Sequence, residues 1–107
     1  MSLFGKLFDT EKNSNSEFPF SDAKNAATIT CCHIMNDGHA ILYAAHDEDD
    51  GMWQFLCGKV HETGEAMIVA LEEVFNRDNS IAAVVKLPYG YEAERKDKRT
   101  EWIVRKK

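Results

Sequence analysis

The sequence predicts a single α+β domain, and three features of its 107 residues lead to that prediction. In the first half of the chain, short segments rich in β-branched and aromatic residues are separated by Asn, Asp and Gly turn signals. Apolar residues then recur at helical spacing, and two further strand-like segments close the chain. The predicted architecture is an antiparallel β-meander with two short helices and a C-terminal β-hairpin. A hydrophobic fraction of 44% is sufficient for one modest core.

Three strands joined by tight turns are expected in the first half. Residues 28–35 form the first strand, and the Asn-Asp-Gly sequence of residues 36–38 favours a hairpin because these residue types tolerate positive φ angles. The chain returns over residues 40–45 and turns again at residues 47–51. Residues 53–57 form the third strand, with alternate side chains on opposite faces. This alternation puts the first, third and fifth of them, Trp53, Phe55 and Cys57, on one face.

The pattern changes to a helical one after residue 70. Residues 66–70 are apolar and fit either a short strand or the start of a helix. Leu71, Val74 and Phe75 then repeat at the spacing of one helix face. The sequence therefore predicts a helix that starts near Leu71.

A second helix and a final hairpin are expected in the last third of the chain. Asn79 or Ser80 is suited to cap a short helix that runs to about residue 86. Residues 91–95 and 101–104 read as two strands around a charged loop. These two strands make the predicted C-terminal β-hairpin.

Residues 1–26 are expected to be an N-terminal segment and linker, and residues 27–107 to be the folded domain. The linker is either disordered or has Phe18 and Phe20 packed onto the domain. Apolar residues at helical spacing within residues 1–8 favour a frayed turn or a short helix that docks on the domain, with weak attachment to a membrane surface or a partner as the alternative. These eight residues lack the features of a secretory signal, and no later run is long enough to span a bilayer.

Net charge and cysteine content narrow the classes of function. A net charge of −5 argues against nucleic-acid binding, because neutralising phosphates needs a basic surface. Three cysteines, two of them adjacent, make a poor disulfide framework. Reduced thiols are the simpler interpretation, and they predict a cytoplasmic protein.

Cysteines and histidines are the sharpest candidates for chemistry. Cys31 and His33 share one face of the first predicted strand, and Cys57 and His61 lie four residues apart. Each pair offers half of a zinc site, which makes a small metal-binding regulatory module the alternative function. The spacing matches no standard zinc knuckle. An enzyme with Cys57 as a nucleophile beside His33 or His61 also stays open, although no glycine-framed elbow accompanies the cysteine.

Charge is distributed unevenly along the chain. Residues 36–73 contain nine carboxylates and one lysine, whereas residues 95–107 contain seven basic residues and two acidic ones. The two regions either neutralise each other or leave an acidic face that steers a basic partner. The acidic run at residues 47–50 does not match a calcium loop, because Cys57 stands where the closing glutamate is required.

Exposed turns supply the candidates for partner binding. Aromatic residues contribute much of the binding energy at interfaces, and two tyrosines flank the turn at Gly90. The partner-binding candidates are the carboxylates and tyrosines of two turns: Asp47, Glu48, Asp49, Asp50, Tyr89 and Tyr91.

Three segments together carry a family resemblance: residues 53–58 (Trp-Gln-Phe-Leu-Cys-Gly), 71–81 and 87–95. In this order they resemble a family of small, uncharacterised bacterial domains, some of which are catalogued as predicted immunity proteins of polymorphic-toxin systems. The resemblance covers residues 28–105. It carries over no catalytic residues, and it implies a cytoplasmic α+β domain that binds and blocks another protein.

Three functional hypotheses follow. The favoured one is a non-catalytic protein-binding domain that blocks its partner, a toxin for example, through an acidic face. If the toxin is a nuclease, the carboxylates of residues 47–50 would mimic phosphates in its basic active site. The zinc-binding module and an enzyme of unrecognised type are the alternatives.

Overall fold

The computed structural model describes residues 18–58 and 64–107, and within them six strands form one sheet. The strand order is β4-β1-β3-β2-β5-β6. Neighbouring strands pair antiparallel except β1 and β3, which run parallel. The elements in chain order are β1 (Ala27–Cys31), α1 (Cys32–Asp37), β2 (Tyr43–His46), β3 (Trp53–Leu56), β4 (Ala66–Ala70), α2 (Leu71–Arg77), the 3₁₀ helix η1 (Asn79–Val84), β5 (Tyr91–Glu94) and β6 (Ile103–Lys106). The predicted α+β class is confirmed.

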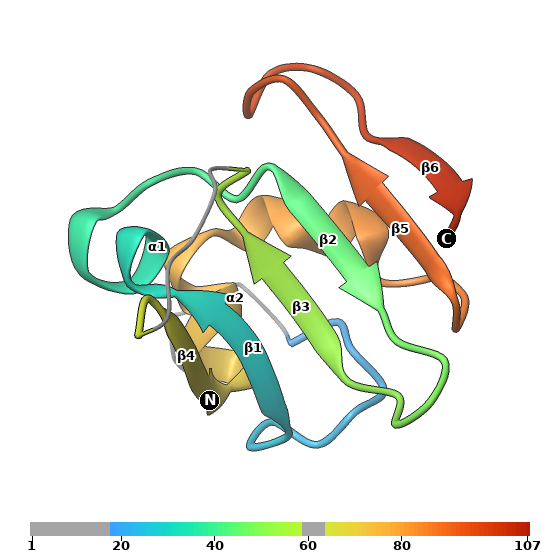
Figure 1. Cartoon of the computed structure of the whole chain (residues 1–107), viewed down its shortest axis with the longest axis horizontal. Coiled ribbons are helices and arrows are strands. Elements are labelled where there is room, and N and C mark those ends of the chain that lie inside the picture. Colours follow the sequence, from blue (N-terminus) through green and yellow to red (C-terminus); the bar gives the residue numbers. More distant parts are fainter. Residues whose placement is uncertain (1–17, 59–63) are drawn as a thin grey trace, which may run out of the picture.

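Helices α2 and η1 lie behind the sheet in the view of Figure 1, and no described helix covers the opposite face. Alternation along β3 directs Trp53 and Phe55 into the core, where Leu71, Val74 and Ile81 from the helices are also fully or almost fully buried. The opposite face of the sheet is called the open face below. None of the described helices is long and apolar enough to cross a membrane.

The first predicted hairpin is wrong. The strand expected over residues 28–35 ends at Cys31, and residues Cys32–Asp37 form α1. A helical turn buries both Ile34 and Met35, whereas adjacent residues of a strand point to opposite faces. Gly38, with φ 74°, ends this helix in the left-handed conformation, so the Asn-Asp-Gly sequence marks a helix end. Strand β1 therefore pairs with β3 and β4 and not with β2.

The second predicted hairpin is confirmed. Strands β2 and β3 pair antiparallel on either side of residues 47–51. Strand β2 begins at Tyr43, three residues later than the predicted start at residue 40. The reason lies at Ile41, whose amide donates to Asp78 Oδ2 and whose carbonyl accepts from Arg95 Nε at 2.9 Å. Its backbone groups therefore bond to side chains in place of a neighbouring strand.

The second half follows the predicted order with shifted boundaries. Residues 66–70 are strand β4, and α2 begins at Leu71 as predicted. The second helix is a 3₁₀ helix that ends at Val84, and its cap is Asp78 and neither Asn79 nor Ser80. Asp78 Oδ1 accepts a hydrogen bond from the Ser80 amide at 3.0 Å. The C-terminal hairpin is confirmed, although β6 starts at residue 103 and not at 101.

The folded part of the chain starts before residue 27. Phe20 is 6% exposed, and its ring centroid lies 5.2 Å from that of Trp53 and 6.3 Å from that of Phe75. Trp53 Nε1 donates a hydrogen bond to Asp22 Oδ1 at 3.2 Å. Residues 18–26 thus pack on the domain through their aromatics, while the predictions for residues 1–17 lie outside the described chain.

A buried ion pair holds the end of β5 against η1. Arg95 Nη2 lies 3.3 Å from Asp78 Oδ2, and both side chains are almost completely buried. The guanidinium also donates to the Ser80 hydroxyl at 2.9 Å and lies 4.2 Å from the centroid of the Trp102 ring. Because each charge is paired and hydrogen-bonded, removing either partner would leave an uncompensated charge in the core.

Candidate functional site

The acidic run forms the exposed tip of the β2–β3 hairpin. The Gly51 amide donates to the Asp47 carbonyl at 3.0 Å, and Asp50 Oδ1 accepts from the Met52 amide at 2.9 Å. Gly51 has a φ of 72°, a backbone angle that residues other than glycine rarely adopt. These bonds leave the side chains of Glu48, Asp49 and Asp50 exposed to solvent. The tip is thus a hydrogen-bonded turn with a defined shape.

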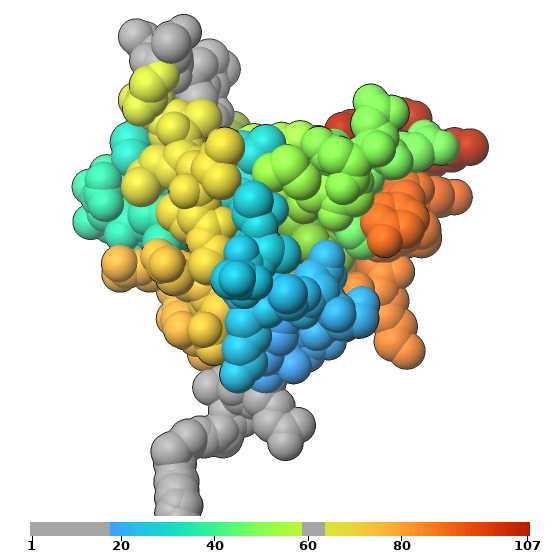
Figure 2. Space-filling model, turned by 90° about the horizontal axis from the view of Figure 1, so that it is seen from below, coloured from blue at the N-terminus to red at the C-terminus, as the bar shows by residue number. Residues whose placement is uncertain are grey.

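Tyr89 lies directly against this turn. The Tyr89 ring packs over Gly51, since a Cβ atom placed on this glycine would lie 3.4 Å from Tyr89 Cε1. The Glu48 carboxylate packs over Gly90 in the same way, with Oε1 3.2 Å from the position of a Cβ atom there. Tyr89 remains 62% exposed. Figure 2 shows the green β2–β3 turn beside the orange segment that precedes β5. We call Glu48, Asp49, Asp50 and Tyr89 the turn surface.

His46 holds the two parts of the turn surface together. Its ring stacks on Trp53 with centroids 3.9 Å apart and contacts Tyr89 at 4.4 Å. His46 Nδ1 lies 2.8 Å from the Leu87 carbonyl oxygen, so Nδ1 carries a hydrogen and donates it. The Gly90 amide donates to the His46 carbonyl at 2.7 Å. Residues 87–90 are therefore fixed to the end of β2.

Asp47 and Tyr91, which the sequence placed in the same set, have mainly structural contacts. Asp47 accepts from Gln54 Nε2 at 2.8 Å and pairs with Lys107 Nζ at 3.0 Å. Partial burial works to raise the pKa of Asp47, but hydrogen bonds from Gln54 and Lys107 outweigh it and hold that pKa below its ordinary value. Tyr91 is half-buried and packs against the core.

The acidic and basic regions of the sequence meet at this end of the molecule. Lys106 and Lys107 line a hollow of about 280 Å³ together with residues 47–50. Other carboxylates lie elsewhere: Glu72 on α2 is 3.7 Å from Lys24. The charge asymmetry is thus partly self-complementary, and the turn surface holds three exposed carboxylates in succession, at residues 48–50.

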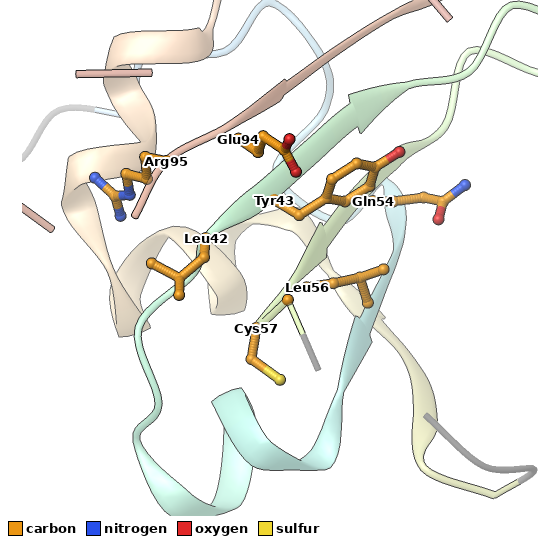
Figure 3. Close-up of a pocket in the computed structure, with 8 residues that line it drawn as sticks. Leu42, Tyr43, Gln54, Leu56, Cys57, Glu94 and Arg95 are labelled. Atoms are coloured by element: carbon orange, nitrogen blue, oxygen red, sulfur yellow. The ribbon is translucent and has the colours of Figure 1, made fainter. Parts of the chain in front are cut away.

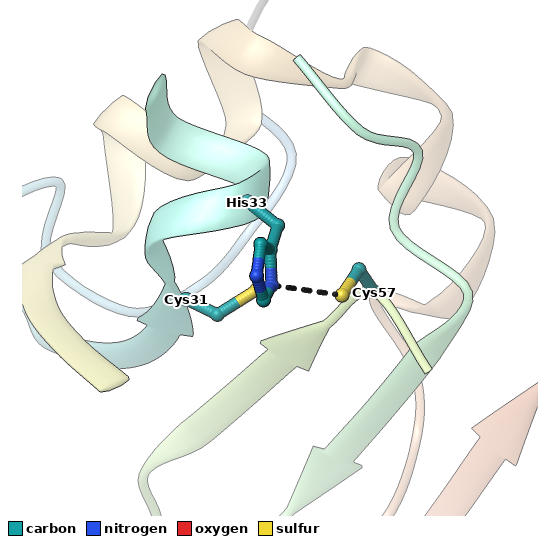
Figure 4. Close-up of side chains that lie close together, drawn as sticks. All are labelled: Cys31, His33 and Cys57. Atoms are coloured by element: carbon teal, nitrogen blue, oxygen red, sulfur yellow. Dashed lines mark hydrogen bonds between the residues drawn. The ribbon is translucent and has the colours of Figure 1, made fainter. Parts of the chain in front are cut away.

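The predicted metal ligands Cys31, His33 and Cys57 are brought together (Figure 4). Cys57 Sγ lies 3.5 Å from His33 Nδ1, and the three donor atoms lie within 4.8 Å of one another. Burial raises the pKa of the Cys31 thiol. The fourth predicted ligand, His61, lies outside the described residues.

A groove on the open face has no counterpart in the sequence predictions. Its volume is about 690 Å³, and its lining includes Tyr43, Gln54, Glu94 and Cys57 (Figure 3). The Tyr43 hydroxyl donates to Glu92 at 2.8 Å, and burial and this hydrogen bond raise the pKa of Tyr43 to about 12. This raised pKa keeps the phenol protonated near neutral pH. Tyr43, Gln54 and Glu94 come from three different strands, so the register of the sheet brings them together.

Comparisons of the chain with protein-family models, with curated proteins and with solved structures find no match.

Proposed function

We propose that this protein is a non-catalytic protein-binding domain of the immunity type, which blocks a positively charged site of its partner with the turn surface. The proposal includes a bacterial, cytoplasmic setting and a toxin as the partner, in line with the family resemblance. The observation that carries it is the contact between an exposed aromatic side chain, Tyr89, and the turn that presents Glu48, Asp49 and Asp50.

Rigidity of the turn surface supports a role in binding. The carboxylates project from a hydrogen-bonded turn, and Tyr89 is held by residues that bond to β2. A surface that is already ordered loses less conformational entropy on association than a flexible loop does. An exposed tyrosine supplies a large contact area with only two side-chain torsions to fix.

Charge selects the kind of partner. Asp47 is neutralised within the domain by Lys107, whereas Glu48, Asp49 and Asp50 have exposed side chains at the tip. Three carboxylates on one short turn resemble the charge of successive phosphates, so they fit a basic nuclease site. Opposite potentials on the two surfaces would steer encounter and raise the association rate.

Two triple variants with the same change in net charge test this proposal. The first, E48Q/D49N/D50N, removes the exposed carboxylates of the turn surface and keeps an oxygen acceptor at residue 50. The control, D37N/E72Q/E73Q, removes three carboxylates from α1 and α2. Both variants and the native chain are immobilised and used to capture proteins from the native organism.

The proposal predicts a protein retained by the native chain and by the control but lost with E48Q/D49N/D50N. Tyr89→Ala should weaken the binding of that protein by about 2 kcal/mol, the cost of truncating an interface hot spot. Equal capture by both triple variants would contradict a role for the turn surface.

A further inference from the structure

We propose that Cys31, His33 and Cys57 form a site for a thiophilic divalent cation, Zn²⁺, which is bound through two thiolates and one imidazole. This site is separate from the turn surface.

The parallel pairing of β1 and β3 creates the site. Thr28 lies opposite Trp53 and Ile29 opposite Gln54, so the carboxyl ends of the two strands reach the same edge of the sheet. Cys31 is the last residue of β1, and Cys57 directly follows β3. α1 begins at the next residue after β1 and supplies His33 from its first turn.

The distances between the donor atoms fit a tetrahedral ion. With Zn–S bonds of about 2.3 Å and Zn–N bonds of about 2.0–2.1 Å, a sulfur and a nitrogen ligand lie about 3.6 Å apart and two sulfurs about 3.8 Å apart. Cys57 Sγ and His33 Nδ1 are already 3.5 Å apart. The other separations are at most 4.8 Å, so side-chain shifts of about 1 Å or less complete the set.

Glu65 orients the imidazole for this role. Its Oε2 atom lies 3.4 Å from His33 Nε2, on the opposite side of the ring from Cys57. A carboxylate at Nε2 favours the tautomer with its hydrogen there, which leaves the Nδ1 lone pair for a metal. Metal-binding histidines commonly have such a carboxylate partner.

Burial of the ligands is consistent with a metal site, and it is also consistent with the simpler view of the thiols as small core residues. Cys31 is 0% and Cys57 4% exposed. A thiol that only fills space in a core needs no imidazole nitrogen at hydrogen-bond distance, whereas a zinc site of mixed cysteine and histidine ligands places one there. Binding of Zn²⁺ would release one proton from each of the two thiols as they become thiolates.

A second group of possible ligands shares His33. Cys32, His33 and Glu65 also lie within 4.8 Å of one another. That group offers one thiol and uses the carboxylate as a ligand, while a Zn²⁺ ion favours the group with two thiolates. Cys32 therefore provides a matched cysteine control, and His39, whose ring lies 5.9 Å from that of His33, provides a histidine control.

Cobalt titration of the reduced full chain after chelator treatment tests the site. We expect one equivalent of Co²⁺ to bind with sulfur-to-cobalt charge-transfer absorption, and Zn²⁺ to displace it. Zn²⁺ affinity, measured by chelator competition, should fall roughly 100-fold or more in C31S, H33A and C57S, and 10-fold to about 100-fold in E65Q. The C32S and H39A variants should bind within about threefold of the native chain.

A measurement on the native chain removes any dependence on whether the variants fold. Because Cys31 and Cys57 are buried, alkylation of the three cysteines is followed in urea below the unfolding midpoint, where local opening exposes them, with and without one equivalent of Zn²⁺ and with mass spectrometry to locate the label. Protection of Cys31 and Cys57 with continued labelling of Cys32 is the expected result. Unchanged labelling of Cys31 and Cys57, cobalt binding without sulfur absorption, or loss of binding in C32S would each overturn the site.

Discussion

Replacing Phe20 with alanine tests whether the segment before β1 belongs to the domain. Phe20 is 6% exposed, and its ring centroid lies within 6.3 Å of those of Trp53, Phe55 and Phe75. Phe→Ala substitutions in cores cost about 3–5 kcal/mol. Since Phe20 comes from a connecting segment that can partly relax, we expect a loss near the lower end, about 3 kcal/mol in the free energy of unfolding.

Urea unfolding followed by tryptophan fluorescence measures this loss, because Trp53 is in contact with the substituted ring. The midpoint of thermal unfolding should fall by about 12–24 °C for a domain of this size. Phe18→Ala is the graded control, since Phe18 is only half-buried, and it should cost about half as much. A loss below about 1 kcal/mol for Phe20→Ala would refute the inclusion of residues 18–26 in the core.

Two further predictions concern the turn that carries the acidic run. Asp47→Asn should lower the free energy of unfolding by about 0.5–1.5 kcal/mol at neutral pH. The folded pKa of Asp47 is depressed, so its contribution to the free energy of unfolding is present above the unfolded pKa of about 4 and is lost as pH falls through the folded pKa. The stabilities of the native chain and the variant should therefore converge in acid. A difference in stability that persists in acid would contradict the ion pair with Lys107. Gly51→Ala should cost about 1–2 kcal/mol, as measured by thermal unfolding, because alanine is strained at a φ of 72°. An unchanged melting temperature would show that the turn rearranges.

Short-range patterns in the sequence correctly predict those strands and helices whose own residues carry the signal. Alternation along residues 53–57 predicts the buried face of β3, and the spacing of Leu71, Val74 and Phe75 predicts α2. The Asn-Asp-Gly sequence misled because glycine in the left-handed conformation ends a helix as readily as it turns a hairpin. The 3₁₀ helix is capped by Asp78, a residue that also pairs with Arg95, which directly follows β5, and no local pattern reports that pair.

The candidate sites depend on contacts between distant parts of the chain. The sequence named Cys31, His33 and Cys57, but their proximity rests on the parallel pairing of β1 with β3, which the predicted meander did not include. Tyr89 meets the acidic turn because β5 pairs with β2 in a register that puts Tyr91 opposite His46. Sequence composition suggested these residue types, and only the sheet order brings them together.

The central claim is that a preformed acidic turn with an aromatic neighbour steers the domain to a basic partner. The most direct test is the association rate of the captured partner with the native chain and with E48Q/D49N/D50N, at low salt and at 0.5 M salt. At low salt the variant should associate about 10-fold or more slowly, and the difference should shrink at high salt as the charges are screened. Equal association rates at low salt would contradict the claim.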